Sequence, residues 1–134
     1  MKRLSMLTAL AILPLLFGFS MKNTTVKLAD EIAGVYTGVL TKNGQTDKSF
    51  SLQVAKVSDK MVEVIANEGN SGQSFKAKVW EDHLSNIRIL RLEPIGNVVM
   101  KNGMMTPSNG RLSYDISPKG SKRMEIFTGM KNGR

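Results

Sequence analysis

Few side chains of this sequence have the type and spacing that catalysis requires. His83 is the single histidine and there is no cysteine. A metal site needs several such ligands, so we expect His83, beside Glu81 and Asp82, to cap a loop. The adjacent carboxylates of Asp30 and Glu31, like those of Glu81 and Asp82, would point to opposite faces of a strand. Neither pair therefore converges on one bond, as the two carboxylates of a glycosidase do.

Serines are numerous, but the sequence has no nucleophile elbow and no credible general base beside them. We therefore expect no catalytic residue, no metal ion and no cofactor. An enzyme is the least favoured of the three functional classes that the sequence leaves open.

Five apolar or amphipathic side chains instead suggest ligand binding. Met100, Met104 and Met105 flank one Asn-Gly dipeptide, and flexible thioethers adapt to apolar ligands of varied shape. They predict an apolar lip on a binding site, with packing as core filler as the alternative. Tyr36 and Tyr114 each share a strand face with aliphatic residues, so we expect them to face inward. There a ligand's polar head could supply the partner that a buried phenol needs.

Basic side chains suggest a second kind of partner. The full chain carries a net charge of +8, and Lys119, Lys122 and Arg123 gather around one turn. Such a cluster predicts binding to an anionic surface, such as envelope polysaccharide or lipid head groups. The alternative is that scattered lysines only keep the domain soluble, because the sequence has no run of five or six like charges.

Trp80 is the only tryptophan, and it alternates with Lys76 and Lys78. An outward indole beside two ammonium groups could stack on a sugar ring or a base. The alternative is that it covers one end of the fold. We do not expect nucleic-acid binding, because a groove for a single strand recruits several aromatic side chains and this stretch offers one.

The elements that must position these residues are short segments of period-2 alternation between turn residues, with no stretch that could hold a long helix. We expect strands over residues 34–42, 45–57, 60–66, 73–80, 84–92, 97–101, 104–107, 111–117 and 121–130. The pair 97–101 and 104–107 includes a short ninth strand.

Three dipeptides fix how these strands are joined. Asn43-Gly44, Asn102-Gly103 and Asn109-Gly110 favour type I′ hairpins between antiparallel neighbours. Sequential hairpins predict an all-β fold, a single small antiparallel up-and-down β-barrel of about eight strands, because closure removes the exposed edges of an open sheet. An interior of that size is either filled by side chains or holds one small ligand, and the sequence leaves both open.

Two of the expected strands change phase. Val57 has the parity opposite to that of Phe50, and Ile87 and Ile89 have the parity opposite to that of Leu90. Each change predicts a β-bulge, which inserts one extra residue and bends the strand. Phe50 and Phe75 lie on the regular apolar parity of their strands and are predicted to lie in the core.

Residues 1–20 have the features of a secretory signal peptide. Lys2 and Arg3 form a positive start, residues 4–19 are apolar, and the segment ends in the small residue Ser20. A membrane anchor is the alternative, but this apolar stretch contains a proline and is shorter than the roughly 20 residues that a span needs.

We expect cleavage near Ser20 and a soluble mature protein outside the cytoplasm, either periplasmic or secreted. Loss of Lys2 and Arg3 would lower the net charge to +6. Residues 21–33 read as a polar lead-in, and residues 34–134 fit one domain.

Three stretches together resemble the bacterial secreted calycin-like (lipocalin-like) β-barrel family: residues 36–41 followed by Asn43-Gly44, residues 95–99, and residues 126–131. Residues 34–36 are also similar to the Gly-x-Trp opening of lipocalins, with Tyr36 in place of the tryptophan. The resemblance implies an eight-stranded calycin-like domain over residues 34–134, an extracytoplasmic setting and an apolar ligand. It implies no catalytic residues.

Two functions therefore lead. The first is a secreted, non-enzymatic carrier or scavenger that binds a small apolar molecule in the barrel. The second is an extracytoplasmic interaction module that binds anionic polysaccharide, a lipid surface or a protein. A cavity lined by the two tyrosines would favour the carrier, and a barrel filled by side chains would favour the module.

Overall fold

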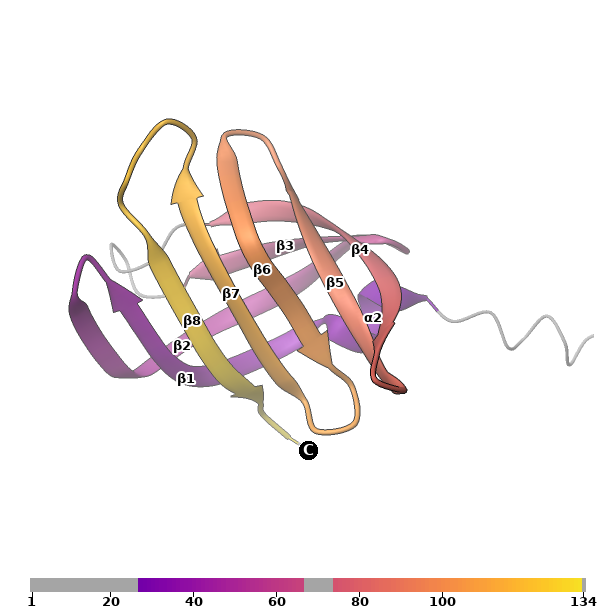
Figure 1. Cartoon of the computed structure of the whole chain (residues 1–134). Helices are drawn as coiled ribbons and strands as arrows, with labels where there is room; N and C mark the ends of the chain where they lie inside the picture. Colours follow the sequence, from indigo (N-terminus) through magenta and orange to yellow (C-terminus); the bar gives the residue numbers. More distant parts are fainter. Residues whose placement is uncertain (1–26, 67–73, 134) are drawn as a thin grey trace, which may run out of the picture.

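The computed structural model describes residues 27–66 and 74–133. One short helix precedes eight strands in this part of the chain (Figure 1). The elements are α2 (Leu28–Ile32), β1 (Gly34–Lys42), β2 (Gln45–Ser58), β3 (Met61–Ala66), β4 (Phe75–Leu84), β5 (Ile87–Ile95), β6 (Val98–Thr106), β7 (Arg111–Pro118) and β8 (Glu125–Lys131).

The strands close into one antiparallel up-and-down barrel. Each strand pairs with the next, and β1 pairs with β8 over seven positions, from Tyr36 opposite Lys131 to Lys42 opposite Glu125. Figure 1 shows β8 lying directly beside β1, so no strand edge is left unpaired at this seam. The predicted fold class is confirmed.

Two-residue turns join several of these strands. Asn43 and Gly44 both have positive φ angles, 52° and 82°, as a type I′ hairpin requires, and this predicted turn is confirmed. Ser85 and Asn86 have the same signs, 53° and 68°, and join β4 to β5. This second turn was not predicted, and β4 extends beyond the expected end at residue 80, because Ser-Asn lacks the glycine that usually marks such a turn.

The predicted hairpin at Asn102-Gly103 is wrong. Both residues lie within β6, which is continuous and leaves no ninth strand. Met100 pairs with Ile116 and Gly103 with Tyr114, so β6 takes one more residue than β7 across this interval. Asn102 therefore lies in a β-bulge between the paired residues Met100 and Gly103. Both halves of β6 pair with β7, and this pairing overrides the local preference of the dipeptide for a turn.

One of the two predicted phase changes is confirmed as a bulge. The register of β2 against β3 shifts between Lys56 and Ser58, as the parity of Val57 indicated. The second is wrong, since β4 and β5 pair without a shift from Leu84 opposite Ile87 onward. Ile89 is buried on the outer parity instead, apart from the main core cluster.

Aromatic side chains fill the middle of the barrel. Ring centroids lie 6.1 Å apart for Phe50 and Phe127, 5.6 Å for Phe127 and Tyr114, and 5.3 Å for Tyr114 and Phe75. Such edge-to-face and tilted pairs add to the stabilisation from burial alone. Phe50 and Phe75 are buried, as their strand parity predicted.

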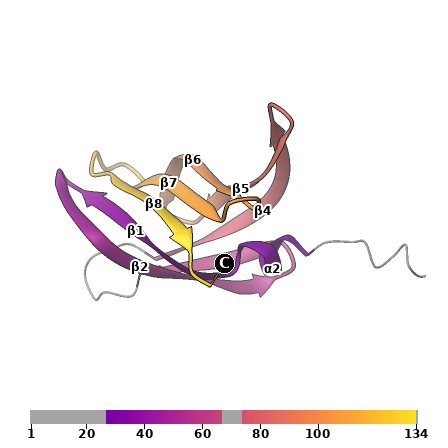
Figure 2. The same cartoon turned by 90° about the horizontal axis from the view of Figure 1, so that it is seen from below.

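Helix α2 closes one end of the barrel. Its apolar side chains Leu28, Ala29 and Ile32 are buried in the same core cluster as the strands. The Ala29 N–H donates to the carbonyl of Asp59, in the β2–β3 turn, at 2.9 Å. Helix α2 packs against β2 and β4, and Figure 2 shows it on the side of the barrel where β2 lies, so part of the segment expected as a polar lead-in is an integral element of the fold.

Glu31 ties this helix to two strands. Arg88 of β5 donates two hydrogen bonds to its carboxylate, and Lys131 of β8 donates to its carbonyl oxygen at 2.9 Å. Hydrogen bonding from Arg88, the largest effect, lowers the pKa of Glu31 below its usual value. Arg88 also contacts Glu81, with 3.2 Å between Nε and Oε2.

We expect Phe50→Ala to lower the free energy of unfolding by about 3–5 kcal/mol, out of a total of about 5–15 for such a domain. The side chain is fully buried, so truncation loses its transfer energy and leaves a cavity. Urea unfolding measures the change. Val99→Ala is the control because Val99 is 48% exposed, and it should stay within about 0.5 kcal/mol of wild type.

Because the pKa of Glu31 is lowered, the stabilisation that its contact with Arg88 gives to the fold depends on pH. Because the folded-state pKa lies below the unfolded one, the stabilisation is complete above about pH 4.5 and is lost as pH falls through the folded value. Glu31→Gln should therefore be less stable than wild type at neutral pH, with the gap closing in acid. Urea unfolding across this pH range tests it, with Glu63→Gln, on the outer face of β3, as the matched control.

Candidate functional site

Tyr36 faces into the barrel as predicted, but its hydroxyl already has a protein partner. It donates to the carbonyl oxygen of Ile32 at 2.7 Å, and the whole side chain is buried. The bond satisfies a carbonyl at the end of α2 that the short helix leaves open. Tyr36 therefore holds the closing helix in place.

Tyr114 also faces inward, between Phe75 and Phe127. Burial, followed by the nearby carboxylate of Glu125, raises the pKa of its phenol well above the usual value, so the group stays neutral. Glu125 is itself 7% exposed, and Lys42 Nζ lies 3.9 Å from its carboxylate. This inward carboxylate was not predicted, although Glu125 shares the strand parity of the inward Phe127, which is a signal for its burial.

The three methionines do not gather at one lip. Met105 is buried in the core, opposite Leu90 and Leu112. Met104 has the opposite parity and is half-buried on the outer surface. Met100 is half-buried and packs against the core from the side of the bulge. Of the three, only Met100 lines a hollow in the barrel wall that the structure describes.

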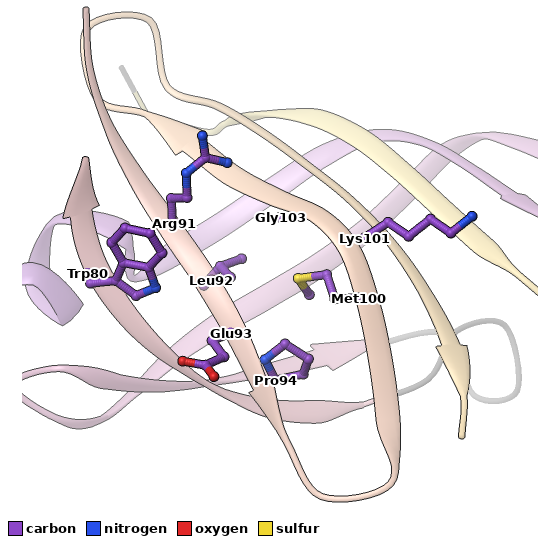
Figure 3. A pocket seen from close by; sticks show the side chains of 8 residues that line it. All are labelled: Trp80, Arg91, Leu92, Glu93, Pro94, Met100, Lys101 and Gly103. Atoms are coloured by element: carbon purple, nitrogen blue, oxygen red, sulfur yellow. The ribbon is translucent and has the colours of Figure 1, made fainter. Parts of the chain in front are cut away.

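This hollow, the β5–β6 crevice, has a volume of about 380 Å³ (Figure 3). Within residues 87–106, all of which are described, β5 and β6 pair only at Leu90 with Met105 and Arg91 with Met104. Beyond these pairs the regular pairing stops, although β5 and β6 remain neighbours and are joined by the two-residue turn at Gly96 and Asn97. The crevice is lined by Trp80, Arg91, Leu92, Glu93, Pro94, Met100, Lys101 and Gly103.

Local sequence explains why the wall opens here. Pro94 of β5 has no N–H to donate to a neighbouring strand, and the bulge in β6 displaces the facing residues. A methyl group on Gly103 would collide with the Met100 sulfur and lie 3.2 Å from Leu92 Cβ. The glycine therefore provides the space into which the Met100 thioether folds.

The floor and the rim of the crevice differ in polarity. Leu92 belongs to the buried core, and Figure 3 shows the Met100 sulfur directed toward it. Arg91 on the rim donates to Asp82 at 2.9 Å, and this hydrogen bond is the main reason that the pKa of Asp82 is lowered. Lys101 extends away from the other side chains. The crevice thus combines an apolar floor at Leu92 and Met100 with a rim that exposes more polar than apolar surface.

A second hollow of about 270 Å³ lies on the other side of Trp80. This β3–β4 hollow is lined by Ser58, Lys60, Met61, Lys78, Val79, Trp80 and Glu93. Trp80 and Glu93 border both hollows. The outward orientation expected for Trp80 is correct, since its side chain is 45% exposed on the outer parity of β4.

The predicted basic cluster lies at the end of the barrel opposite α2. Lys119, Lys122 and Arg123 are all exposed in the connection between β7 and β8. The Lys119 N–H donates to the carbonyl of Asn97 at 2.8 Å, which joins this connection to the β5–β6 turn. The three side chains are thus together and open to solvent.

Other kinds of site have little support in the described ranges. Residues 27–66 and 74–133 contain no group of three or more His, Cys, Asp or Glu side chains that could hold a metal ion. His83 lies on the exposed part of β4, with Nε2 3.9 Å from a carboxylate oxygen of Glu81. No helix in these ranges has the length and hydropathy of a transmembrane span.

Comparison of the chain with protein-family models, with curated proteins and with solved structures finds no match. The closed eight-stranded antiparallel barrel is consistent with the fold that the calycin-like resemblance implied. Membership of that family stays a prediction.

Proposed function

We propose that this chain is a non-enzymatic binding protein that takes up a small apolar ligand at the β5–β6 crevice. The observation that carries the proposal is the hollow between β5 and β6, which reaches the core residue Leu92 where regular pairing of the two strands stops. Its volume of about 380 Å³ lies in the range of small-molecule sites.

The described interior is filled by side chains, which favours the interaction module over a carrier that encloses its ligand inside the barrel. A small apolar ligand would therefore have to enter at the wall. Tyr36, Phe50 and Phe127 are fully buried against other side chains, so a ligand in their place would have to displace the aromatic core. Met100 is different because it is half-buried and its unbranched thioether can change rotamer at small cost. A ligand that displaces Met100 would cover Leu92 and gain apolar burial while leaving the core intact.

The proposed compartment is outside the cytoplasm, to which the predicted signal peptide in residues 1–20 would direct the chain. A barrel that binds a small apolar molecule there would act as a carrier or scavenger. This role agrees with the ligand class that the calycin-like resemblance implies.

A neutral apolar dye such as Nile red should bind the folded protein with one-to-one saturation and little dependence on salt, because apolar burial is not screened by ions. Met100→Gln should weaken the dye about tenfold, since an amide in the crevice adds a desolvation cost of about 1.4 kcal/mol. Fluorescence titration measures both quantities.

Met104→Gln is the matched control, with the same chemistry on the same strand but outside the crevice. It should leave dye affinity unchanged. A polar substitution at Met105 is unsuitable as a control, because that side chain is buried in the core and the substitution would destabilise the fold. Equal loss of affinity in Met100→Gln and Met104→Gln would place the dye elsewhere and contradict the proposal.

One observation favours a second candidate function, an interaction module for anionic surfaces. Lys119, Lys122 and Arg123 are exposed on a single connection, and none of them takes part in an ion pair among the described residues. Three cations on one convex turn create a local positive potential that attracts anionic lipid or polymer.

For this candidate, the protein should bind vesicles of phosphatidylglycerol and phosphatidylcholine but not vesicles of phosphatidylcholine alone. Binding should fall steeply between low and physiological salt, because exposed charges are screened. Replacing Lys119, Lys122 and Arg123 together by Gln should abolish it while Nile red affinity stays unchanged. Sedimentation with vesicles gives the readout, and salt-independent binding would rule the candidate out.

A further inference from the structure

We propose that Trp80 and the β3–β4 hollow form a binding site for an acidic saccharide, with one sugar ring on the indole face. The site goes beyond the proposed function, because its polar groups lie across Trp80 from the floor of the β5–β6 crevice. It needs neither an apolar ligand nor the basic connection between β7 and β8.

The indole of Trp80 supplies the platform. Its side chain is 45% exposed at the border of two hollows, although tryptophan is on average among the well-buried residues. The flat, electron-rich ring suits the C–H face of a pyranose, which is apolar and carries partial positive charge. Figure 3 shows the ring lying between Arg91 and Glu93, with its nitrogen on the side of Glu93.

The groups around this platform supply the hydrogen bonds that a saccharide needs. Lys60, Lys78 and Glu93 line the hollow, and none of them takes part in an ion pair among the described residues. The neighbouring charges Arg91 and Asp82, in contrast, are paired with each other. Lys101 at the β5–β6 crevice is also outside any ion pair of the described part of the chain, and Lys78 lies opposite Glu93 on the paired strands. What distinguishes the β3–β4 hollow is that two lysines and one glutamate border a mainly apolar surface beside the exposed indole.

Their chemistry points to an acidic sugar. Two ammonium groups, on Lys60 and Lys78, outnumber the one carboxylate, on Glu93, so a ligand carboxylate would be attracted. Glu93 can accept hydrogen bonds from ring hydroxyls, and the hydroxyl of Ser58 can donate or accept. A bare phosphate or a fatty acid would leave Glu93 without such a donor.

Single-stranded nucleic acid, which could also stack on an indole, fits less well. Such binding recruits a row of aromatic side chains along a basic groove. In the described ranges the other aromatic side chains, Tyr36, Phe50, Phe75, Tyr114 and Phe127, are all buried in the core. The platform thus has room for one ring and not for a strand.

The test uses Trp80 itself as the reporter, since it is the only tryptophan of the chain. Titration of the protein with trigalacturonate should change the tryptophan fluorescence in a saturable way. Maltotriose, which lacks the carboxylates, should bind at least tenfold more weakly. Equal affinity for the two sugars would overturn the acidic assignment.

Two variants locate the binding. Lys60→Met with Lys78→Met should weaken trigalacturonate at least tenfold, and Trp80→Ala should do the same when heat is measured by calorimetry instead of fluorescence. Replacement of Lys119, Lys122 and Arg123 by Met removes as many cations elsewhere and should leave the affinity unchanged. Loss of affinity in that control alone would move the site to the basic connection and overturn the proposal.

Two further outcomes keep this site distinct from the apolar one. Met100→Gln should weaken Nile red and spare trigalacturonate, so failure of either function can be recognised without the other. A thymidine oligonucleotide that binds more tightly than trigalacturonate and loses affinity in Trp80→Ala would identify a nucleic-acid site and overturn the saccharide assignment.

Discussion

The close approach of the first and last strands is the constraint on which the rest of this barrel depends. Gly38 pairs with Gly129 across the seam, and a methyl group on Gly38 would collide with the backbone of Thr128 and Gly129. A methyl on Gly129 would meet the Phe127 ring at 2.5 Å. Glycine at both positions therefore lets the sheet close and leaves room for Phe127 to pack against Phe50 in the centre.

The way the barrel closes limits the places at which a ligand could bind. The inner face is occupied by aromatic rings in mutual contact, and α2 closes one end with the Tyr36 hydroxyl on its last carbonyl. A ligand that leaves this packing intact would have to bind outside the aromatic core. One hollow that reaches a core residue from outside is the β5–β6 crevice, where β6 bulges and Met100 lies over Gly103.

The fold was largely predictable because its determinants are local. Period-2 alternation located the strands, and Asn43-Gly44 formed the hairpin that its φ preferences indicate. Asn102-Gly103 has the same preferences and became a bulge, since pairing with β7 on both sides of it is a long-range interaction that no short window contains. Helix α2 was missed for a related reason: five residues form a helix here because the barrel end buries their apolar side chains.

The candidate sites were predictable only in part. Parity placed Tyr36 and Tyr114 inside and Trp80 outside, and the same rule would have placed Glu125 inside. It could not show that Tyr36 bonds to Ile32, nor that Met100, Met104 and Met105 lie in three different environments, because a bulge resets parity within one strand. The crevice lies where the regular pairing of β5 with β6 stops, and the point at which pairing between two strands stops leaves no pattern in either strand alone. Binding surfaces of small closed barrels are therefore best sought where the sheet departs from regular pairing.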